Sequence, residues 1–275
     1  MTILYRGLVS GQYVYWNSNQ STPSGVSDTI ILNDNITPQL VTRPAIDANH
    51  THVWYLGEGC TTDGTNIIAD VGGINMDRVQ GSGSLTTGYG IFKTQKSGLL
   101  ISSSQGATAF EAPVTTTTTQ DVTLECIVKI PSWGADVSTI GSYIPMVQLT
   151  SAGPTYTQLN FFYVTNGNTF TFSTANGGTY NLPNVSYGAL LSTLTPDIPH
   201  HFMTSWEYST KTVKYYIDGY QFGAPYTWGT DRPINMTVAQ IWMIPNGGSV
   251  ADVRISNVVR SQSYALAATN AMRSL

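Results

Sequence analysis

The chain has 275 residues, a net charge of -4 and a charged share of only 10%, far below the roughly 25% of an average globular domain. No run of Lys or Arg occurs, so the basic surface that a nucleic-acid binder needs is not expected. The apolar share of 41% is sufficient for a core, and the wealth of Gly, Thr, Ser, Asn and Tyr favours β structure with uncharged loops.

The first 45 residues differ in character from the rest. Residues 2–16 contain two strand-like pieces, residues 17–28 form a polar stretch with Pro and Gly, and residues 29–41 supply one more strand before Arg43-Pro44 breaks the pattern. An isolated hairpin buries too little apolar surface to be stable alone. We therefore predict an N-terminal β arm over residues 1–45, which anchors or oligomerises the protein, and a main domain over residues 46–275.

Targeting and redox signals are sparse. The N-terminus lacks a charged region followed by an unbroken apolar stretch, and no window approaches about 18 consecutive apolar residues. We expect neither a signal peptide nor membrane insertion. Cys60 and Cys126 are too few for a disulfide framework and wrongly spaced for a zinc knuckle, so two buried free thiols are expected, although their pairing stays open.

The main domain contains many short apolar-alternating segments separated by turn residues, which is typical of a sandwich or jelly roll. A β-meander is predicted from residue 158 to 182, with turns at Asn166-Gly167 and at residues 176–178. A short closing helix is predicted near the C-terminus, with Ser261 or Ser263 as its N-cap. Further strands are expected over residues 98–104, 121–130, 200–208, 211–217, 239–245 and 251–259.

Several of these segments resemble, in order, the motifs of a concanavalin A-like jelly roll of the laminin G type. Residues 52–75 resemble its opening strand and Asp-x-x-Gly turn, and residues 121–132 resemble the next motif, with Cys126 where an aromatic residue is usual. Residues 199–225 resemble the family's His-His strand and Tyr-x-Asp-Gly hairpin, and residues 251–268 its closing strand and helix. The resemblance implies an all-β sandwich. It does not decide the function, because lectins, glycosidases, protein-binding modules and virion components share this fold.

The residues needed for hydrolysis are missing. A retaining glucanase needs two carboxylates about 5 Å apart on one strand face, whereas Glu125 and Glu207 each stand alone among apolar residues. Neither a nucleophile elbow nor a phosphate-binding glycine loop with a lysine occurs. We expect both glutamates to be satisfied strand positions and the protein not to be an enzyme.

Two metal sites are conceivable from spacing. His50 and His52 would share one face of a strand and could supply two nitrogen ligands, a pair that resembles the His-x-His metal sites of some trimeric phage fibres. Asp63, Asn66 and Asp70 supply oxygen donors within one loop, where laminin G-like domains often bind calcium. Ordinary surface histidines and turn residues explain the same patterns, so no cofactor is predicted and calcium stays open.

A glycan site would place aromatic faces beside polar side chains. Residues 224–233 form the best candidate loop, because Tyr226, Trp228 and Asp231 lie close together in it. Packing at the rim of the core is the alternative interpretation of these aromatic residues.

The favoured hypothesis is a non-enzymatic virion protein, such as a bacteriophage tail-fibre, receptor-binding or capsid-decoration component. Its expected partners are other virion proteins, further copies of itself, for instance in a trimer, and a host cell-surface glycan. The reasons are the uncharged β composition, the missing catalytic pairs and an N-terminal arm suited to pairing between subunits. The alternative is a soluble lectin-like carbohydrate-binding module, and a glycosidase ranks third.

Overall fold

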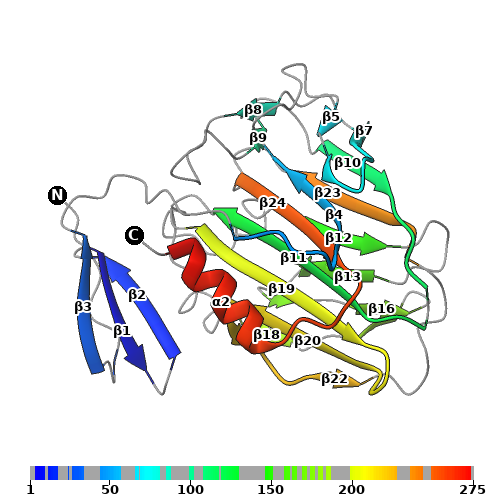
Figure 1. Cartoon of the computed structure of the whole chain (residues 1–275). Coiled ribbons are helices and arrows are strands. Elements are labelled where there is room, and N and C mark those ends of the chain that lie inside the picture. Colours follow the sequence, from blue (N-terminus) through cyan, green and yellow to red (C-terminus); the bar gives the residue numbers. More distant parts are fainter. Residues whose placement is uncertain are drawn as a thin grey trace.

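The computed structural model describes a β-sandwich with one C-terminal helix, as predicted (Figure 1). The described residues are 4–9, 12–17, 24, 27–33, 44–56, 66–67, 69–80, 85–87, 99–101, 108–117, 119–129, 146–150, 158–161, 163–165, 169–171, 174–176, 179–181, 184–186, 199–227, 236–243 and 249–273. None of the helical structure in these ranges is long and apolar enough to cross a membrane.

Two large antiparallel sheets form the sandwich. The ten-stranded sheet has the order β21-β20-β19-β11-β24-β4-β6, with β22 paired to β20, β9 to β24 and β8 to β9. Its strands are β4 (His50–Tyr55), β6 (Ala69–Val71), β8 (Leu85–Thr87), β9 (Leu99–Ile101), β11 (Val122–Lys129), β19 (Pro199–Glu207), β20 (Thr212–Ile217), β21 (Tyr220–Gln221), β22 (Tyr226–Thr227) and β24 (Ser249–Ser256).

The eight-stranded sheet has the order β17-β16-β13-β12-β23-β10-β7-β5. Its strands are β5 (Asn66–Ile67), β7 (Met76–Gln80), β10 (Thr108–Pro113), β12 (Met146–Thr150), β13 (Gln158–Phe161), β16 (Thr174–Asn176), β17 (Thr179–Asn181) and β23 (Val238–Met243).

The core lies between the two sheets because side chains alternate across each strand. On β11, Leu124, Cys126 and Val128 point inward, and from the opposite sheet Phe110 and Ile241 meet them. Cys126 is a free buried thiol, as expected, and burial raises its pKa well above the usual value. Cys60 lies outside the described residues. The same alternation leaves the intervening residues of each strand on the outer faces of the sandwich.

The N-terminal segment forms a three-stranded antiparallel sheet of its own, with the order β2-β1-β3. Its strands are β1 (Leu4–Val9), β2 (Gln12–Asn17) and β3 (Ser27–Asn33), drawn in dark blue in Figure 1. No strand of either large sheet is hydrogen-bonded to these three within the described part of the chain. The predicted strands of the arm are therefore present, while the domain boundary at residue 45 stays a prediction.

The predicted meander is only partly correct. Strands β16 and β17 form a hairpin around residues 177–178, and β13 pairs with β16. The intervening strands β14 (Tyr163–Thr165) and β15 (Thr169–Thr171) pair with each other and with β18 (Asn184–Ser186) in a separate three-stranded sheet. The hairpin geometry was predictable from local turn residues, but the division of these strands between two sheets depends on long-range pairing.

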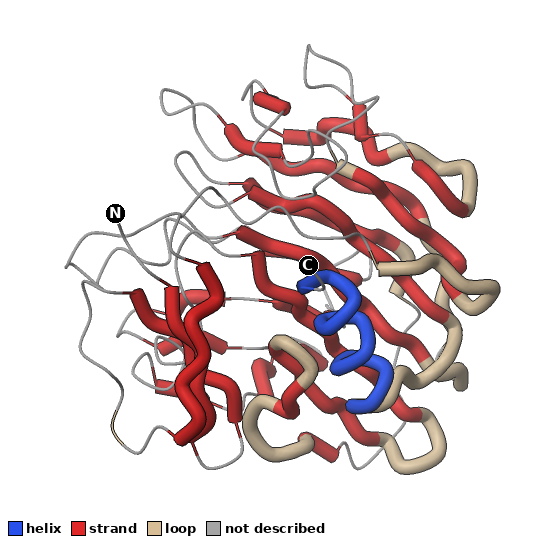
Figure 2. The backbone as a smooth tube through the Cα atoms, turned by 60° about the vertical axis from the view of Figure 1, so that its left-hand side comes forward, coloured by secondary structure: helices blue, strands red, loops and turns tan. Residues whose placement is uncertain are grey.

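Helix α2 (Gln262–Arg273) covers the outer face of the ten-stranded sheet (Figures 1 and 2). Ser261 is the N-cap, because its Oγ accepts a hydrogen bond from the Tyr264 amide at 3.3 Å. Ala265 packs against Met203 and Tyr216, and Met272 packs against Tyr55, Ile127 and Ala251. Two apolar contacts, one near each end of the helix, thus hold α2 against the sheet.

The turn at Asp218-Gly219 joins β20 to β21 with φ values of +52° and +87°. Positive φ at both central positions is the geometry for which Asp-Gly is selected in two-residue hairpins. The Asp218 carboxylate accepts hydrogen bonds from the His201 amide at 3.0 Å and lies 2.6 Å from His200 Nδ1. Asp218 therefore fixes the turn to β19, which is a structural role.

Candidate functional site

The candidate metal ligands His50 and His52 do not share one strand face. The pairing of β4 with β24 is irregular between Ile255 and Ser256, opposite these two histidines, so simple alternation does not hold. His50 is buried with Nε2 3.1 Å from Glu125 Oε1, whereas His52 stacks on Trp54 with ring centroids 5.6 Å apart. Among the described residues, no group of three or more His, Cys, Asp or Glu is placed to hold a metal ion.

The calcium prediction assumed one loop, and this assumption was wrong. Asn66 lies on β5 of the eight-stranded sheet, and Asp70 lies on β6 of the ten-stranded sheet. The chain crosses between the two sheets there, so the segment is built from two short strands. Asp63 lies outside the described residues, and calcium binding stays open.

The predicted glycan loop is described only at its start. Tyr226 and Thr227 form β22, which pairs with β20 at the edge of the ten-stranded sheet. Tyr226 is half-buried against the main core, as the packing alternative expected, while Thr227 is exposed. Trp228 and Asp231 lie outside the described residues, so their role in glycan binding stays a prediction.

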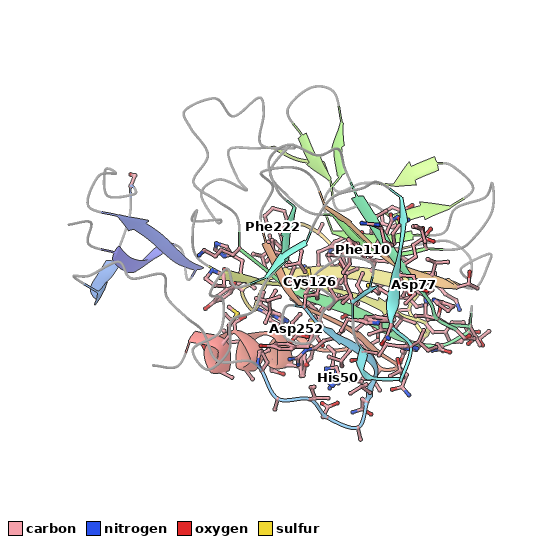
Figure 3. The ribbon with its side chains drawn as sticks, turned by 90° about the horizontal axis from the view of Figure 1, so that it is seen from above. His50, Asp77, Phe110, Cys126, Phe222 and Asp252 are labelled. Atoms are coloured by element: carbon pink, nitrogen blue, oxygen red, sulfur yellow. The ribbon has the colours of Figure 1, made fainter. Side chains whose placement is uncertain are left out.

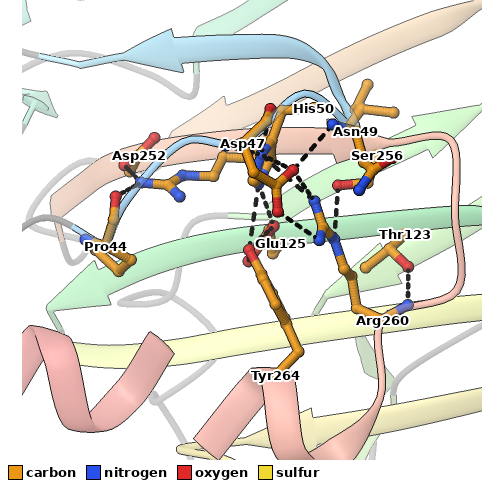
Figure 4. Close-up of polar contacts among 12 residues, drawn as sticks. Pro44, Asp47, Asn49, His50, Thr123, Glu125, Asp252, Ser256, Arg260 and Tyr264 are labelled. Carbon is orange, nitrogen blue, oxygen red and sulfur yellow. Dashed lines mark hydrogen bonds and ion pairs between the residues drawn. The ribbon is translucent and has the colours of Figure 1, made fainter. Parts of the chain in front are cut away.

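Glu125 is the centre of a polar cluster on the outer face of the ten-stranded sheet, under α2 (Figure 4). Its side chain is buried, as are the two histidines that contact it. His50 Nε2 lies 3.1 Å from Oε1, His201 Nε2 lies 3.0 Å from Oε2, and the Tyr264 hydroxyl donates to Oε1 at 3.1 Å. Three strands and the helix thus meet at one carboxylate.

The charge state of the cluster follows from these contacts. Burial by itself would raise the pKa of Glu125, but the hydrogen bonds from His201 and His50 outweigh it, and the pKa lies well below its usual range. Burial and the adjacent Glu125 charge raise the pKa of Tyr264, so its hydroxyl keeps the proton it donates. Glu125 is therefore a hydrogen-bonded carboxylate at neutral pH.

Two arginines extend this cluster to the segment that precedes β4, residues 44–49, which we call the strap. Arg254 donates to the carbonyl oxygens of Pro44 and Ala45 at 2.8 and 3.1 Å and pairs with Asp252 at 2.6 Å. Arg260, just before α2, donates to both Asp47 carboxylate oxygens at 2.7 and 2.6 Å. Figure 3 shows His50 and Asp252 on the α2 side of the molecule, away from Phe110.

This arrangement suits a structural role for Glu125. The crevice beside it, lined by Pro44, His201 and Arg254 among others, has no room for a water molecule. Both carboxylate oxygens of Glu125 already have hydrogen-bond partners. Glu207 forms an ion pair with Lys214, with Nζ 3.2 Å from Oε2. Both glutamates are thus the satisfied strand positions that the sequence predicted.

A second polar arrangement lies on the outer face of the eight-stranded sheet. Asp77 on β7, Glu111 on β10, Gln240 on β23 and Gln148 on β12 are directly opposite one another in register. Their chain neighbours, such as Phe110, Ile241 and Val147, face the core, so these four form a polar row on the other side of the sheet. The backbone pairing continues from Asp77 to Asn66 on β5 and from Gln148 to Asn160 on β13.

Hydrogen bonds fix the middle of this polar row. Gln240 Nε2 donates to Glu111 Oε1, and Gln148 Nε2 donates to Gln240 Oε1. Both glutamines are buried, with exposed fractions of 7% and 6%, whereas Glu111 is half-buried and Asp77 is exposed. The two amides therefore orient Glu111, and the accessible end of the row carries two carboxylates. With neighbouring strands about 4.8 Å apart, four strands span about 14 Å.

Sequence reasoning missed both polar arrangements. Each member of the polar row is a single polar residue in an apolar strand, a signal that shows which residues face away from the core. Which of them stand side by side depends on the register between paired strands whose residues are as many as 129 positions apart, as for Glu111 and Gln240. The Glu125 cluster likewise depends on long-range contacts, because His50 lies 75 residues before Glu125 in the sequence and Tyr264 lies 139 residues after it.

The comparisons with known proteins show the fold. No family model and no curated protein matches the sequence. The receptor-binding domain of botulinum neurotoxin mosaic serotype C/D is similar in structure, with a TM-score of 0.54 and 12% identity over 82% of this chain and 51% of that one. The botulinum neurotoxin serotype G binding domain has a TM-score of 0.53 and 9% identity, over 80% of this chain and 50% of that one. A mutant Trypanosoma rangeli sialidase with trans-sialidase activity has a TM-score of 0.51 and 11% identity, over 81% of this chain and 33% of that one. The chain thus spans a third to a half of these structures, and the likeness shows a β-sandwich fold.

Proposed function

We propose that the protein is a non-enzymatic binding module that recognises neutral carbohydrate through the polar row of the eight-stranded sheet. The observation that carries the proposal is the orientation of Glu111 by the Gln240 and Gln148 amides beside the exposed Asp77. A sugar presents hydroxyl groups that donate hydrogen bonds to carboxylates and also accept them from amides. Polar side chains already held in position lose little entropy when such a ligand binds.

The charge of the row selects among glycans. It contains carboxylate and amide side chains but no cationic one, so a sialylated or sulfated chain would meet like charge. A neutral polyhydroxylated chain meets hydrogen-bond acceptors spaced by one strand separation, about 4.8 Å. We therefore expect a preference for neutral over acidic glycans.

Two further observations support a binding function. Glu125 and Glu207 are each engaged in contacts within the protein, so neither glutamate is free to act in glycoside hydrolysis. Similar folds include receptor-binding domains of toxins, which is support by analogy of fold only.

We further propose the setting of a virion surface, where the module would act as a tail-fibre, receptor-binding or capsid-decoration component. The separate three-stranded N-terminal sheet supports this setting, since three short strands bury little surface alone and gain from pairing with another copy or another virion protein. Mass measurement in solution tests it. A trimer or other homo-oligomer is expected, and a stable monomer would count against assembly through this segment.

Glycan-array binding tests the carbohydrate proposal. The wild-type chain is expected to bind neutral oligosaccharides, and Glu111→Ala to lose that binding at least tenfold. Glu207→Ala, which removes a carboxylate on the opposite sheet, is the matched control and should bind like the wild type. An array without any bound glycan would contradict the carbohydrate function. Binding lost in Trp228→Ala but kept in Glu111→Ala would move the site to the loop of Tyr226, Trp228 and Asp231.

A further inference from the structure

Among the described residues, the strap and α2 both cover the outer face of the ten-stranded sheet, and they come from opposite ends of the main domain. The strap leads from the N-terminal segment into β4, and α2 follows β24. Both lie over the same region around Glu125 (Figure 4). Their contacts with each other are therefore a direct connection between the N-terminal and C-terminal parts of the domain.

Three direct contacts link the strap and the first residue of β4 to α2 and to the segment just before it, residues 257–261. The Arg260 guanidinium, one residue before the N-cap of α2, forms a two-bond ion pair with Asp47 of the strap. The Asn257 amide donates to the Asn49 carbonyl at 3.1 Å. The Tyr264 hydroxyl lies 3.2 Å from His50 Nε2, at the point where the strap enters β4.

The same groups also support one another. The Arg260 guanidinium lies over the Tyr264 ring, 4.3 Å from its centroid, and the Asp47 amide donates to His50 Nδ1 at 3.0 Å. His50 and Tyr264 share the Glu125 carboxylate. If α2 lifts, Glu125 loses a donor and Arg260 loses the ring beneath it. If the strap lifts, Arg260 and Arg254 are left with unpaired donors in a largely buried place.

We propose that the strap and α2 form a clasp, a single cooperative unit that opens and closes as one and couples the exit of the N-terminal segment to the C-terminal helix. Partially buried hydrogen bonds that share members are the kind of network in which loss of one partner weakens the others. Any event that displaces the N-terminal segment is then transmitted to α2, and the coupling acts equally in both directions.

Hydrogen exchange followed by mass spectrometry tests the clasp in the full chain. Tyr264→Phe removes only the helix hydroxyl, and Asp47→Asn removes only the strap charge. The clasp predicts that each variant raises amide exchange about tenfold in both segments, residues 44–49 and 262–273. Tyr264→Phe must therefore accelerate amide exchange in the strap, and Asp47→Asn must accelerate amide exchange in α2.

A matched control excludes general loosening. Glu207→Gln removes the charge from the partly exposed ion pair with Lys214 at the C-terminal end of β19 and should leave amide exchange in both segments unchanged. The proposal is overturned if Tyr264→Phe affects only α2 and Asp47→Asn only the strap. It is equally overturned if Glu207→Gln accelerates both segments as much as the two clasp variants do.

Discussion

The two outer faces of the sandwich carry polar residues in opposite circumstances. On the ten-stranded sheet, Glu125 is buried beneath α2 and the strap, and each of its oxygens has a partner. On the eight-stranded sheet, the polar row ends in the half-buried Glu111 and the exposed Asp77. The first arrangement is enclosed and uses its hydrogen-bonding capacity internally, while the second places its carboxylates at an accessible surface. A carboxylate in a strand thus acquires its role from what covers it.

The largest difference between the faces should be seen in stability. Glu125→Ala leaves His50, His201 and Tyr264 without their shared partner in a buried place, and we expect a loss of about 3–5 kcal/mol in the free energy of unfolding. Urea unfolding measures it. Glu111→Ala on the other face should cost less than about 1 kcal/mol. Equal losses for the two variants would remove the distinction between a structural and a binding face. If Glu125→Ala does not fold, Glu125→Gln gives the same ranking.

The seating of α2 on the sheet can be tested with two glycines. Gly219 has φ +87°, and a Cβ there would lie 2.5 Å from the Leu266 Cα in α2, whereas Gly73 has φ +68° and open space around the same position. Gly73→Ala should cost about 1–2 kcal/mol through backbone strain alone. Gly219→Ala should cost at least about 1 kcal/mol more, because the helix must move. Thermal unfolding of both variants provides the comparison, and equal losses would show that α2 does not rest on this turn.

The loss of folding stability at acidic pH should depend on the ion pair between Asp47 and Arg260 in the clasp. The hydrogen bonds and charge of Arg260 lower the pKa of Asp47 from 3.8 to about 2, against the opposing effect of burial. Because the folded pKa is depressed, this stabilisation is fully present above about pH 4 and is lost as the pH falls toward 2. With 44% of the side chain exposed, solvent screening limits the contribution to below about 1 kcal/mol. In Asp47→Asn, the melting temperature should fall less steeply between pH 4 and pH 2 than in the wild type. An unchanged pH dependence of the melting temperature would contradict the pairing of Asp47 with Arg260.

The smallest expected effect concerns the charge on the polar row. Asp77 and Glu111 stand directly opposite each other, and like charges in that position destabilise a sheet. Glu111→Gln keeps an acceptor for Gln240 and removes one charge, so stability should rise by about 0.2–1 kcal/mol. Carbohydrate binding should weaken in the same variant, because a neutral amide is a poorer acceptor for hydroxyl groups. A variant that is less stable but binds equally well would contradict this account.

Local chemistry made part of the structure predictable from the sequence. The Asp218-Gly219 turn, the cap at Ser261 and the strands around Glu125 follow from residue preferences over a few positions. The expectation that His50 and His52 share one strand face was wrong, because an irregular pairing with β24 changes the simple alternation of side chains. A bulge depends on the partner strand, which the local pattern does not contain.

Long-range register explains why the sites themselves were not predicted. The approach of His50 to Glu125 spans 75 residues, and the pairing of Glu111 with Gln240 spans 129. Each residue could be assigned to the outside of a strand, but no local rule shows which outside residues become neighbours or which face α2 covers. The sequence also favoured the loop of Tyr226, Trp228 and Asp231, since clustered aromatic residues are visible without any knowledge of pairing.

The most direct test of the contrast between the two faces is glycan-array binding of Tyr264→Phe and Glu111→Ala under identical conditions. Tyr264→Phe alters the clasp without touching the polar row, and Glu111→Ala removes the oriented carboxylate of the row. We expect wild-type binding of neutral glycans by Tyr264→Phe and at least a tenfold loss by Glu111→Ala. The reverse result, with binding lost in Tyr264→Phe and kept in Glu111→Ala, would contradict it.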